Sequence, residues 1–368
     1  MARLDSFLRL VVEQKASDLH FLAGSRPTIR HDGVLTPIPF RELSDAEARR
    51  FLWEILDDER KEQLEKQSEV DFAYDLEGWG RFRTNVFLHR EGIGAVFRVI
   101  PEKVPSMDEL ALPTALRNIS GFHNGLVLFT GPTGSGKSTS QAALINELNE
   151  TRSLHVVTVE DPIEFVHTPA KSMFTQRQVG LHVKSFEEAL RSALREAPDV
   201  LLVGEMRDLE TIRLAISAAE TGVLVFGTLH TGSAAKSIDR IIDAFPEGQT
   251  NQIRGVLSVI LRAVVSQRLV RSASGEGRHA AIEILFGGTG VANMIREGKA
   301  YLIDAMLQSV DPATGMQSLD RHLLRMVRDR MVTLDEAVKH ATYPQTLVDS
   351  AAGLGITSAS SQGGFGGV

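Results

Sequence analysis

The chain has 368 residues, no cysteine and a formal net charge of −7 at pH 7. This length suits two domains, and the lack of cysteine excludes disulfides and thiolate metal sites and favours a reducing compartment. The negative charge argues against broad nonspecific nucleic-acid binding, and charges such as Arg262 interrupt the longest apolar runs. We therefore expect a cytoplasmic protein with no nucleic-acid partner.

Residues 1–100 have the pattern of a small α+β domain. Ser44-Asp-Ala-Glu47 is a capping box, which predicts an amphipathic helix that runs to about Lys66. Aromatic and β-branched residues between glycine turns then predict three strands, at 70–74, 81–89 and 94–100. Three prolines follow, and they mark residues 101–120 as a linker that contains a short helix.

Residues 121–350 have the pattern of an open parallel α/β sheet. Apolar runs that end in polar residues predict strands at 126–130, 155–159, 200–203 and 223–229. Continuous apolar runs indicate burial on both faces, so helices must cover the sheet on both sides. Ser185 and Asp208 are the capping residues that begin two of these helices.

The last third of the chain is predicted to be mainly helical. Residues 252–270 form an apolar stretch that predicts a long helix, and further helical patterns occupy about 290–340. Residues 351–368 are rich in Gly, Ser and Ala and carry almost no charge, so they predict a disordered tail.

The strand at 126–130 runs into a complete phosphate-binding loop. Its residues are Gly131, Pro132, Thr133, Gly134, Ser135, Gly136, Lys137, Ser138 and Thr139. Glycines let successive backbone amides converge on phosphates, Lys137 reaches the β and γ oxygens, and the Ser138 hydroxyl is a ligand for Mg²⁺. The helix that begins here adds the positive end of its dipole. This segment predicts that the chain binds ATP and Mg²⁺.

Acidic residues after the second and third strands are the candidates for hydrolysis chemistry. Glu205 follows four apolar residues and is expected to orient the attacking water or to lie in the metal shell. Glu164 is the rival catalytic base, ahead of Asp161 and Glu160, and the sequence leaves the two roles unassigned. His230 ends the fourth strand, where an imidazole can contact phosphate, water or a carboxylate.

Four segments of the chain together resemble a known family. Gly131 to Thr139, Glu160 to His167, Val203 to Asp208 and Gly227 to Thr231 are similar to the Walker A motif, Asp box, Walker B motif and His box of secretion-superfamily ATPases. Within that superfamily they most resemble the PilT-type retraction ATPases of the bacterial type IV pilus. The likeness extends over residues 1–345 and includes Ala16-Ser-Asp-Leu-His20, Gly80-Arg-Phe-Arg83 and Ala95-Val-Phe-Arg98.

The resemblance implies a PAS-like N-terminal domain joined to a RecA-like ATPase domain, with six copies in a ring. It further implies that Arg81, Arg83 and Arg98 reach the nucleotide, and that an inner-membrane pilus platform protein is the partner. A cytoplasmic motor at the membrane base of the pilus would use ATP to draw pilin back. The chain's lack of cysteine separates it from the longer secretion ATPases, which often carry a four-cysteine zinc module.

The chain departs from the retraction pattern at a few positions. Retraction ATPases usually carry a motif similar to Ala-Ile-Arg-Asn-Leu-Ile-Arg-Glu, whereas this chain reads Gly290-Val-Ala-Asn-Met-Ile-Arg-Glu297, with Ala292 in place of the first arginine. Val223 and Gly232 replace a frequent histidine and threonine. An accessory role of the PilU type, beside a paralogous retraction ATPase, is therefore the alternative.

Overall fold

The structure is a computed structural model that describes residues 2–31, 33–100 and 103–356. The chain folds into two compact units, Met1–Lys103 with Glu164–Val166, and Val104–Ile163 with His167–Val368. Within the described ranges, every helix is too short or too polar to cross a lipid bilayer. Most of the expected disordered tail, residues 357–368, lies outside the described residues, while 351–353 end a helix.

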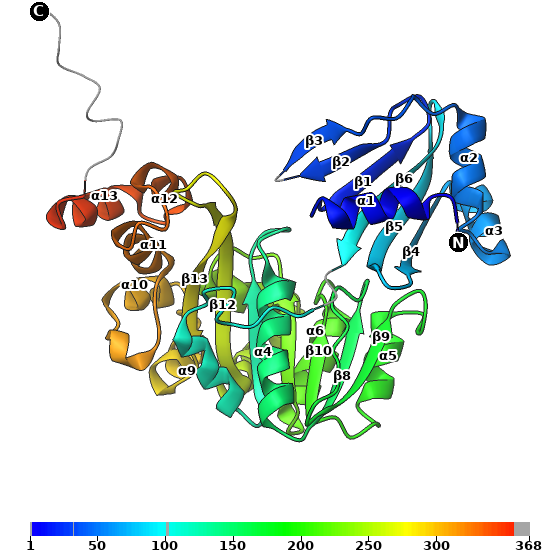
Figure 1. Ribbon diagram of the computed structural model, residues 1–368. Helices are drawn as coiled ribbons and strands as arrows, with labels where there is room; N and C mark the ends of the chain where they lie inside the picture. Colours follow the sequence, from blue (N-terminus) through cyan, green and yellow to red (C-terminus); the bar gives the residue numbers. More distant parts are fainter. Residues whose placement is uncertain (1, 32, 101–102, 357–368) are drawn as a thin grey trace, which may run out of the picture. The chain divides into compact units, whose positions relative to one another are not determined.

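The first unit is built on an antiparallel sheet of six strands in the order β3-β2-β1-β6-β5-β4 (Figure 1). Its strands are β1 Asp18–Leu22, β2 Thr28–His31, β3 Val34–Pro37, β4 Glu69–Leu76, β5 Gly80–His89 and β6 Gly92–Ile100. The three predicted strands are confirmed as β4, β5 and β6, and three shorter strands were not predicted. Helix α1 (Asp5–Glu13) adds Phe7 to an aromatic core, in which its ring meets that of Phe21 edge to face.

The single helix predicted from Ser44 to Lys66 is wrong, because this segment forms two helices. The capping box at Ser44 and Glu47 is present and begins α2 (Asp45–Trp53). The chain then turns, and the Asp57 side chain accepts a hydrogen bond from the Arg60 amide to begin α3 (Asp58–Gln67). A second strong capping residue inside the charged run therefore ends one helix and starts the next.

The second unit is a seven-stranded sheet in the order β13-β12-β7-β11-β10-β8-β9. Six neighbouring strands are parallel, and β13 pairs antiparallel with β12. The strands are β7 Gly125–Thr130, β8 His155–Glu160, β9 Met173–Gln178, β10 Val200–Val203, β11 Leu224–Leu229, β12 Leu261–Arg271 and β13 Arg278–Phe286. The predicted α/β class and its four parallel strands are confirmed.

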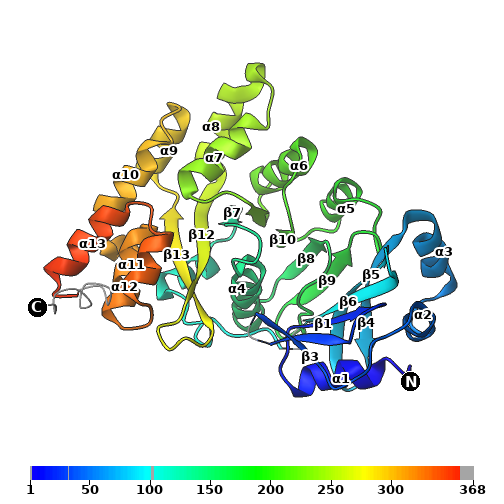
Figure 2. The ribbon, with the colours of Figure 1, turned by 90° about the horizontal axis from the view of Figure 1, so that it is seen from above.

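Helices cover both faces of this sheet (Figure 2). Helices α5, α6, α7 and α8 pack against one face through a core that includes Leu128 and Val203, and α4 and η1 pack against the other through Phe129 and Phe226. The helices are η1 Thr114–Gly121, α4 Lys137–Thr151, α5 Phe186–Ala193, α6 Leu209–Glu220, α7 Ala234–Asp243, η2 Glu247–Gln249, α8 Thr250–Ile260, α9 Thr289–Arg296, α10 Leu302–Ser309, η3 Pro312–Thr314, α11 Leu319–Arg328, α12 Leu334–His340 and α13 Pro344–Gly353.

The long helix predicted over 252–270 is wrong, because α8 ends at Ile260 and strand β12 follows without a loop. β12 is buried from Ala263 to Gln267 and pairs with β7 on one side and β13 on the other. A bulge at Arg262 shifts its register against β7, so that Ser266 stands opposite Thr130. Full pairing and burial on both faces outweigh any helical preference here.

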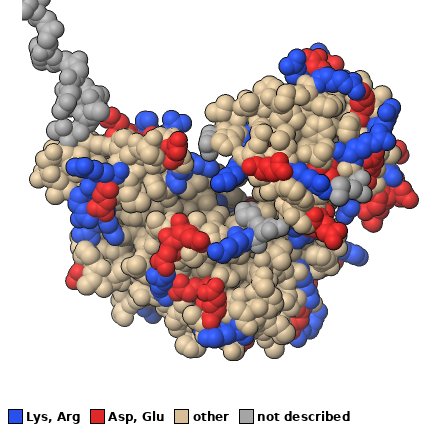
Figure 3. Space-filling view, viewed as in Figure 1, with Lys and Arg blue, Asp and Glu red and all other residues tan. Residues whose placement is uncertain are grey.

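The segment before the sheet belongs to the second unit rather than forming a free linker. Residues from Val104 onward group with this unit, and the buried side chains of Met107, Leu112, Leu116 and Ile119 join the core under α4. The expected short helix is η1. On the face drawn in Figure 3, acidic and basic side chains are interspersed in small groups.

Candidate active site

The candidate catalytic residues of the second unit lie along one edge of its sheet. Gly131 follows β7, His230 follows β11 and Glu205 follows β10 after one glycine. Because these strands are parallel neighbours in the order β7-β11-β10, their carboxyl ends meet at this edge. Glu160, the last residue of β8, continues the row, since β8 pairs with β10. The fold thus brings the phosphate loop, the histidine and two candidate carboxylates together.

The phosphate loop is shaped by close contact with β12. Gly131 and Gly136 both have positive φ, at 143° and 83°. A Cβ at Gly131 would stand 2.2 Å from the Gln267 carbonyl oxygen, and one at Gly136 would stand 2.7 Å from the Gln267 side-chain nitrogen. Only glycine tolerates both the positive φ and the close approach of Gln267 at these two positions. The loop's glycines therefore serve its seating against the sheet as well as its approach to phosphate.

The functional side chains of the loop have different surroundings. Lys137 is 8% exposed, and its ammonium donates to the carbonyls of Gly131 and Pro132, at 2.8 and 3.0 Å. Ser138 and Thr139 are half-buried at the start of α4. The Ser135 hydroxyl is buried without a hydrogen-bond partner among the described residues. An unsatisfied buried hydroxyl inside a phosphate loop fits the presence of a ligand oxygen, because such groups are costly to leave unpaired.

Gln267 is a supporting residue that the sequence did not reveal. Its side-chain nitrogen donates to the Ser135 carbonyl at 2.7 Å, and its side-chain oxygen accepts from the Ser140 hydroxyl at 2.9 Å. The side chain is 2% exposed, so both bonds are sheltered from water. The wrong helix prediction over 252–270 concealed this residue. The signal that was present is the β-branched pair Val264 and Val265, which is typical of a strand and stands two residues before Gln267.

Replacing Gln267 with leucine is expected to raise the Kd for ATP about tenfold. Leucine has a similar size but leaves the Ser135 carbonyl and the Ser140 hydroxyl unpaired, and a net buried hydrogen bond is worth about 1 kcal/mol. Titration with a fluorescent ATP analogue measures this, and Gln252→Leu on the exposed face of α8 is the matched control. An unchanged Kd in folded Gln267→Leu would contradict this role.

Glu205 lies between a histidine and an arginine. One carboxylate oxygen is 2.9 Å from His230 Nε2, and the other is 2.6 Å from Arg207 Nη2. The Arg207 hydrogen bond, aided by the His230 contact, holds the pKa of Glu205 below its usual range, although partial burial acts in the opposite direction. Glu205 therefore stays ionised at neutral pH. Arg207 lies within the Val203 to Asp208 segment, whose sequence pattern assigned it no role.

The other candidate carboxylates fall into different settings. Glu160 accepts a hydrogen bond from Thr158 at 2.6 Å and lies within 3.4 Å of the Gln176 side-chain nitrogen, so a local network holds it. Asp161 is exposed and acts on Arg207 through its charge. Glu164 is also exposed, in the short segment that groups with the first unit. Of the acids named from sequence, only Glu205 contacts His230.

The three arginines singled out in the first unit lie on one face of its sheet. Arg83 and Arg98 stand directly opposite each other on β5 and β6, and Arg81 is two residues before Arg83. Arg98 pairs with Asp18 at 2.9 Å and Arg81 with Asp75 at 3.2 Å. Within the described parts of the chain, Arg83 forms no ion pair. This sheet face therefore carries a guanidinium that no described carboxylate neutralises.

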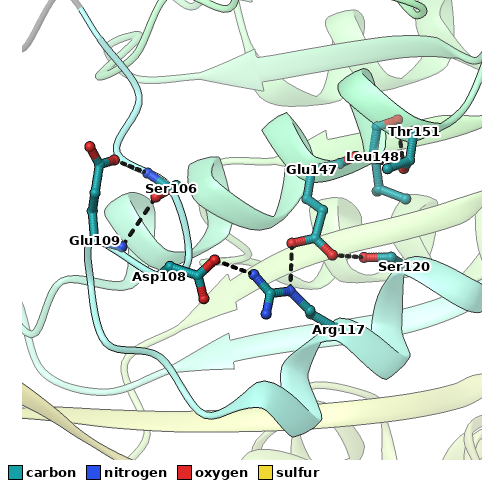
Figure 4. Close-up of polar contacts among 8 residues, drawn as sticks. All are labelled: Ser106, Asp108, Glu109, Arg117, Ser120, Glu147, Leu148 and Thr151. Carbon is teal, nitrogen blue, oxygen red and sulfur yellow. Dashed lines mark hydrogen bonds and ion pairs between the residues drawn. The ribbon is translucent and has the colours of Figure 1, made fainter.

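The helix that follows the phosphate loop is also anchored at its far end (Figure 4). Arg117 of η1 bridges Asp108 and Glu147, at 2.8 and 3.1 Å, and Glu147 belongs to α4. Just past the end of α4, Arg152 donates to the carbonyls of Ser120 and Phe122. Helix α4 is thus fixed to Gln267 at its first turn and to the η1 segment at its last.

Comparisons with known proteins agree with this geometry. Residues 2–314 match the model of the type II/IV secretion system protein family. The type IV pilus retractation ATPase PilT of Pseudomonas aeruginosa is 46% identical over 342 residues, 93% of this chain and 99% of that protein. The type IV pilus ATPase PilU of the same organism is 37% identical, over 92% and 88%. A crystal structure of the pilus retraction motor PilT with bound ADP superposes with a TM-score of 0.86 at 40% identity, over 94% of this chain and 98% of that one.

Proposed function

The chain belongs to the type II/IV secretion system protein family, and from this membership we propose that it is an ATP-hydrolysing motor for type IV pilus retraction. The observation that carries the proposal is the row at the sheet edge, where a complete phosphate loop lies beside the Glu205 and His230 pair. The 46% identity to a retractation ATPase over nearly its whole length gives that chemistry its biological setting.

Different residues of this chain have different roles in the proposed hydrolysis. Lys137 and the amides at the start of α4 neutralise phosphate charge, which grows on the bridging oxygen as the terminal bond breaks. Glu205 is held ionised by Arg207, and a carboxylate with a low pKa is a poor proton acceptor at neutral pH. Its proposed role is to orient the attacking water. His230 fixes the carboxylate and faces the same edge.

Mg²⁺ fits the oxygen donors of this site. No group of three His, Cys, Asp or Glu side chains that could hold a metal by themselves occurs in the described residues. The Ser138 hydroxyl and the Glu205 carboxylate would hold the ion together with the nucleotide, which matches the preference of Mg²⁺ for few protein ligands. When bound, the ion supplies positive charge to the phosphates.

We further propose that six copies form a ring on an inner-membrane platform protein, at the cytoplasmic base of the pilus. In this ring, Arg81, Arg83 and Arg98 contact nucleotide phosphates. The cross-strand pair of Arg83 and Arg98 supports the assignment, because guanidinium groups on one rigid face can bind phosphate oxygens in a fork. An accessory role of the PilU type has one supporting observation, Ala292 in the altered retraction motif of α9.

The test of this function uses purified protein and living cells. The expected result is a hexamer by mass measurement, with steady ATP turnover that requires Mg²⁺. In a bacterium that lacks its own retraction ATPases, expression of this chain alone should restore pilus retraction. A hexamer with negligible turnover, or retraction only beside a second ATPase, would favour the accessory role instead.

A further inference from the structure

Three buried polar side chains form a row across neighbouring strands of the second sheet, next to the residues of the candidate active site. Thr130, Ser266 and Glu283 stand opposite one another on β7, β12 and β13. The Thr130 hydroxyl donates to the Ser266 hydroxyl at 2.9 Å, and the Ser266 side chain lies beside the Glu283 carboxylate and favours its ionised form. At the far end of the row, the Ala234 amide donates to Glu283 Oε1 at 2.8 Å.

Both ends of this row adjoin catalytic loops. Thr130 is the residue before Gly131 and therefore the last one before the phosphate loop. Ala234 is the first residue of α7 and follows His230 by four positions. The Thr231 hydroxyl of that loop meets the Ser237 hydroxyl of α7 at 2.6 Å. Glu283 thus fixes the end of the His230 loop from the sheet side.

Glu283 is an unusual group for this position. It is 6% exposed, and burial raises the pKa of its carboxyl to about 7. The Ala234 amide, the Ser266 hydroxyl and the positive charge of Arg268 on β12 favour the ionised form, while the charge of Asp304 on α10 opposes it. A glutamine would accept the same amide hydrogen without the cost of a buried charge.

We propose that Glu283 is a positioning residue for ATP hydrolysis, which holds the His230 loop through the Ala234 amide and ties it to the phosphate-loop strand through Ser266 and Thr130. This inference rests on the proposed function, because it assigns Glu283 a part in the same reaction. The ionised carboxylate also sets one direction for the hydrogen bonds along the row. An ionised carboxylate accepts from both Ala234 and Ser266, so every donor in the row points toward Glu283.

Protonation would disturb this arrangement. A neutral carboxyl group has a hydroxyl that must itself donate, so Ser266 would have to accept and turn its own proton toward Thr130. The charged groups around Glu283 are Arg268 on β12 and Asp304 on α10, and Lys236 of α7 acts on Asp304. Turnover at saturating ATP is therefore expected to fall as pH drops through about 7, the pKa of Glu283.

The experiment compares wild type with Glu283→Ala, Glu283→Gln and, as an exposed control on α6, Glu220→Gln. Glu283→Ala should lower kcat about tenfold at pH 8 and leave the Kd for a fluorescent ATP analogue within about twofold. Glu283→Gln keeps the acceptor for Ala234 but, like the protonated carboxyl, donates toward Ser266, so its kcat should equal that of wild type at low pH and should no longer change near pH 7. Hydrogen exchange of residues 230–238 should be faster in Glu283→Ala than in wild type.

Stability gives a second readout that does not need turnover. The folded-state pKa of this carboxyl is above its unfolded value of 4.5, so its contribution to stability is full below 4.5 and is lost as pH rises through about 7. The denaturation midpoint of Glu283→Gln, relative to that of wild type, should therefore rise as the pH increases from 5 to 8.

Wild-type kcat and wild-type hydrogen exchange in Glu283→Ala would overturn the proposal. If wild type itself does not hydrolyse ATP, the proposed function fails, while exchange at 230–238 still decides the positioning role.

Discussion

Lys137→Ala is expected to reduce ATP hydrolysis by about 10³-fold. Its ammonium is the one cation inside the phosphate loop, and the carbonyls of Gly131 and Pro132 hold it in place. Alanine removes the charge that would neutralise the terminal phosphates, and no other side chain of the loop can supply it. Phosphate release at saturating ATP, measured beside the mass of the same sample, separates lost chemistry from lost assembly.

The control for this loss is Lys171→Ala, an exposed lysine elsewhere in the second unit. It should keep wild-type turnover and assembly. Lys137→Arg should remain inactive, because a planar guanidinium is larger than the ammonium that the loop encloses. Turnover by Lys137→Ala within a few fold of wild type would show that hydrolysis occurs elsewhere or by another mechanism.

Glu205→Gln is expected to lower kcat by about 10²- to 10⁴-fold while the Kd for ATP changes little. The amide keeps the size of the carboxylate but cannot accept hydrogen bonds from His230, Arg207 and a water at once. Arg207 and His230 depress the pKa of Glu205 below 4.5, so the carboxylate remains ionised and its contribution disappears only as pH falls through that lowered value. Wild type should therefore outperform the variant across the whole range from pH 6 to pH 9.

Companion variants rank the acids at this edge of the sheet. Glu164→Gln and Glu160→Gln, assayed beside Glu205→Gln, separate the three carboxylates, and Glu210→Gln on α6 is the control. Glu205 should dominate, because only it contacts His230 directly. A larger loss in Glu164→Gln than in Glu205→Gln would transfer the water-orienting role to Glu164.

The parts of the fold that sequence predicted are those determined by local pattern. The strands that became β7, β8, β10 and β11 are short apolar runs buried on both faces, and each is bounded by polar or glycine residues. The junction of α8 and β12 lacks such a boundary, since apolar residues continue through Ile260 and Leu261 without Gly or Pro. A helix and a strand then share one hydrophobic run, and periodicity alone cannot divide them.

The site divides in the same way. The phosphate loop was predictable because its nine residues are contiguous and their spacing follows from phosphate geometry. Its support was not, because Gln267 meets Ser135 across 132 positions and only the order of strands brings them together. The Glu205 and His230 pair was predictable in part, because the parallel strand ends predicted a shared edge but not the hydrogen bond of 2.9 Å.

The bulge at Arg262 imposes a constraint on insertions and deletions. Beyond it, alternation along β12 directs Ser266 to Glu283 on one face of the sheet and Gln267 to the phosphate loop on the other. Loss of one residue there would leave the strand just as apolar, yet exchange the faces of both side chains. Related chains can therefore vary many residues of β12 but can hardly change its length. The same alternation of side chains places Ser266 beside Glu283 and Gln267 beside the phosphate loop.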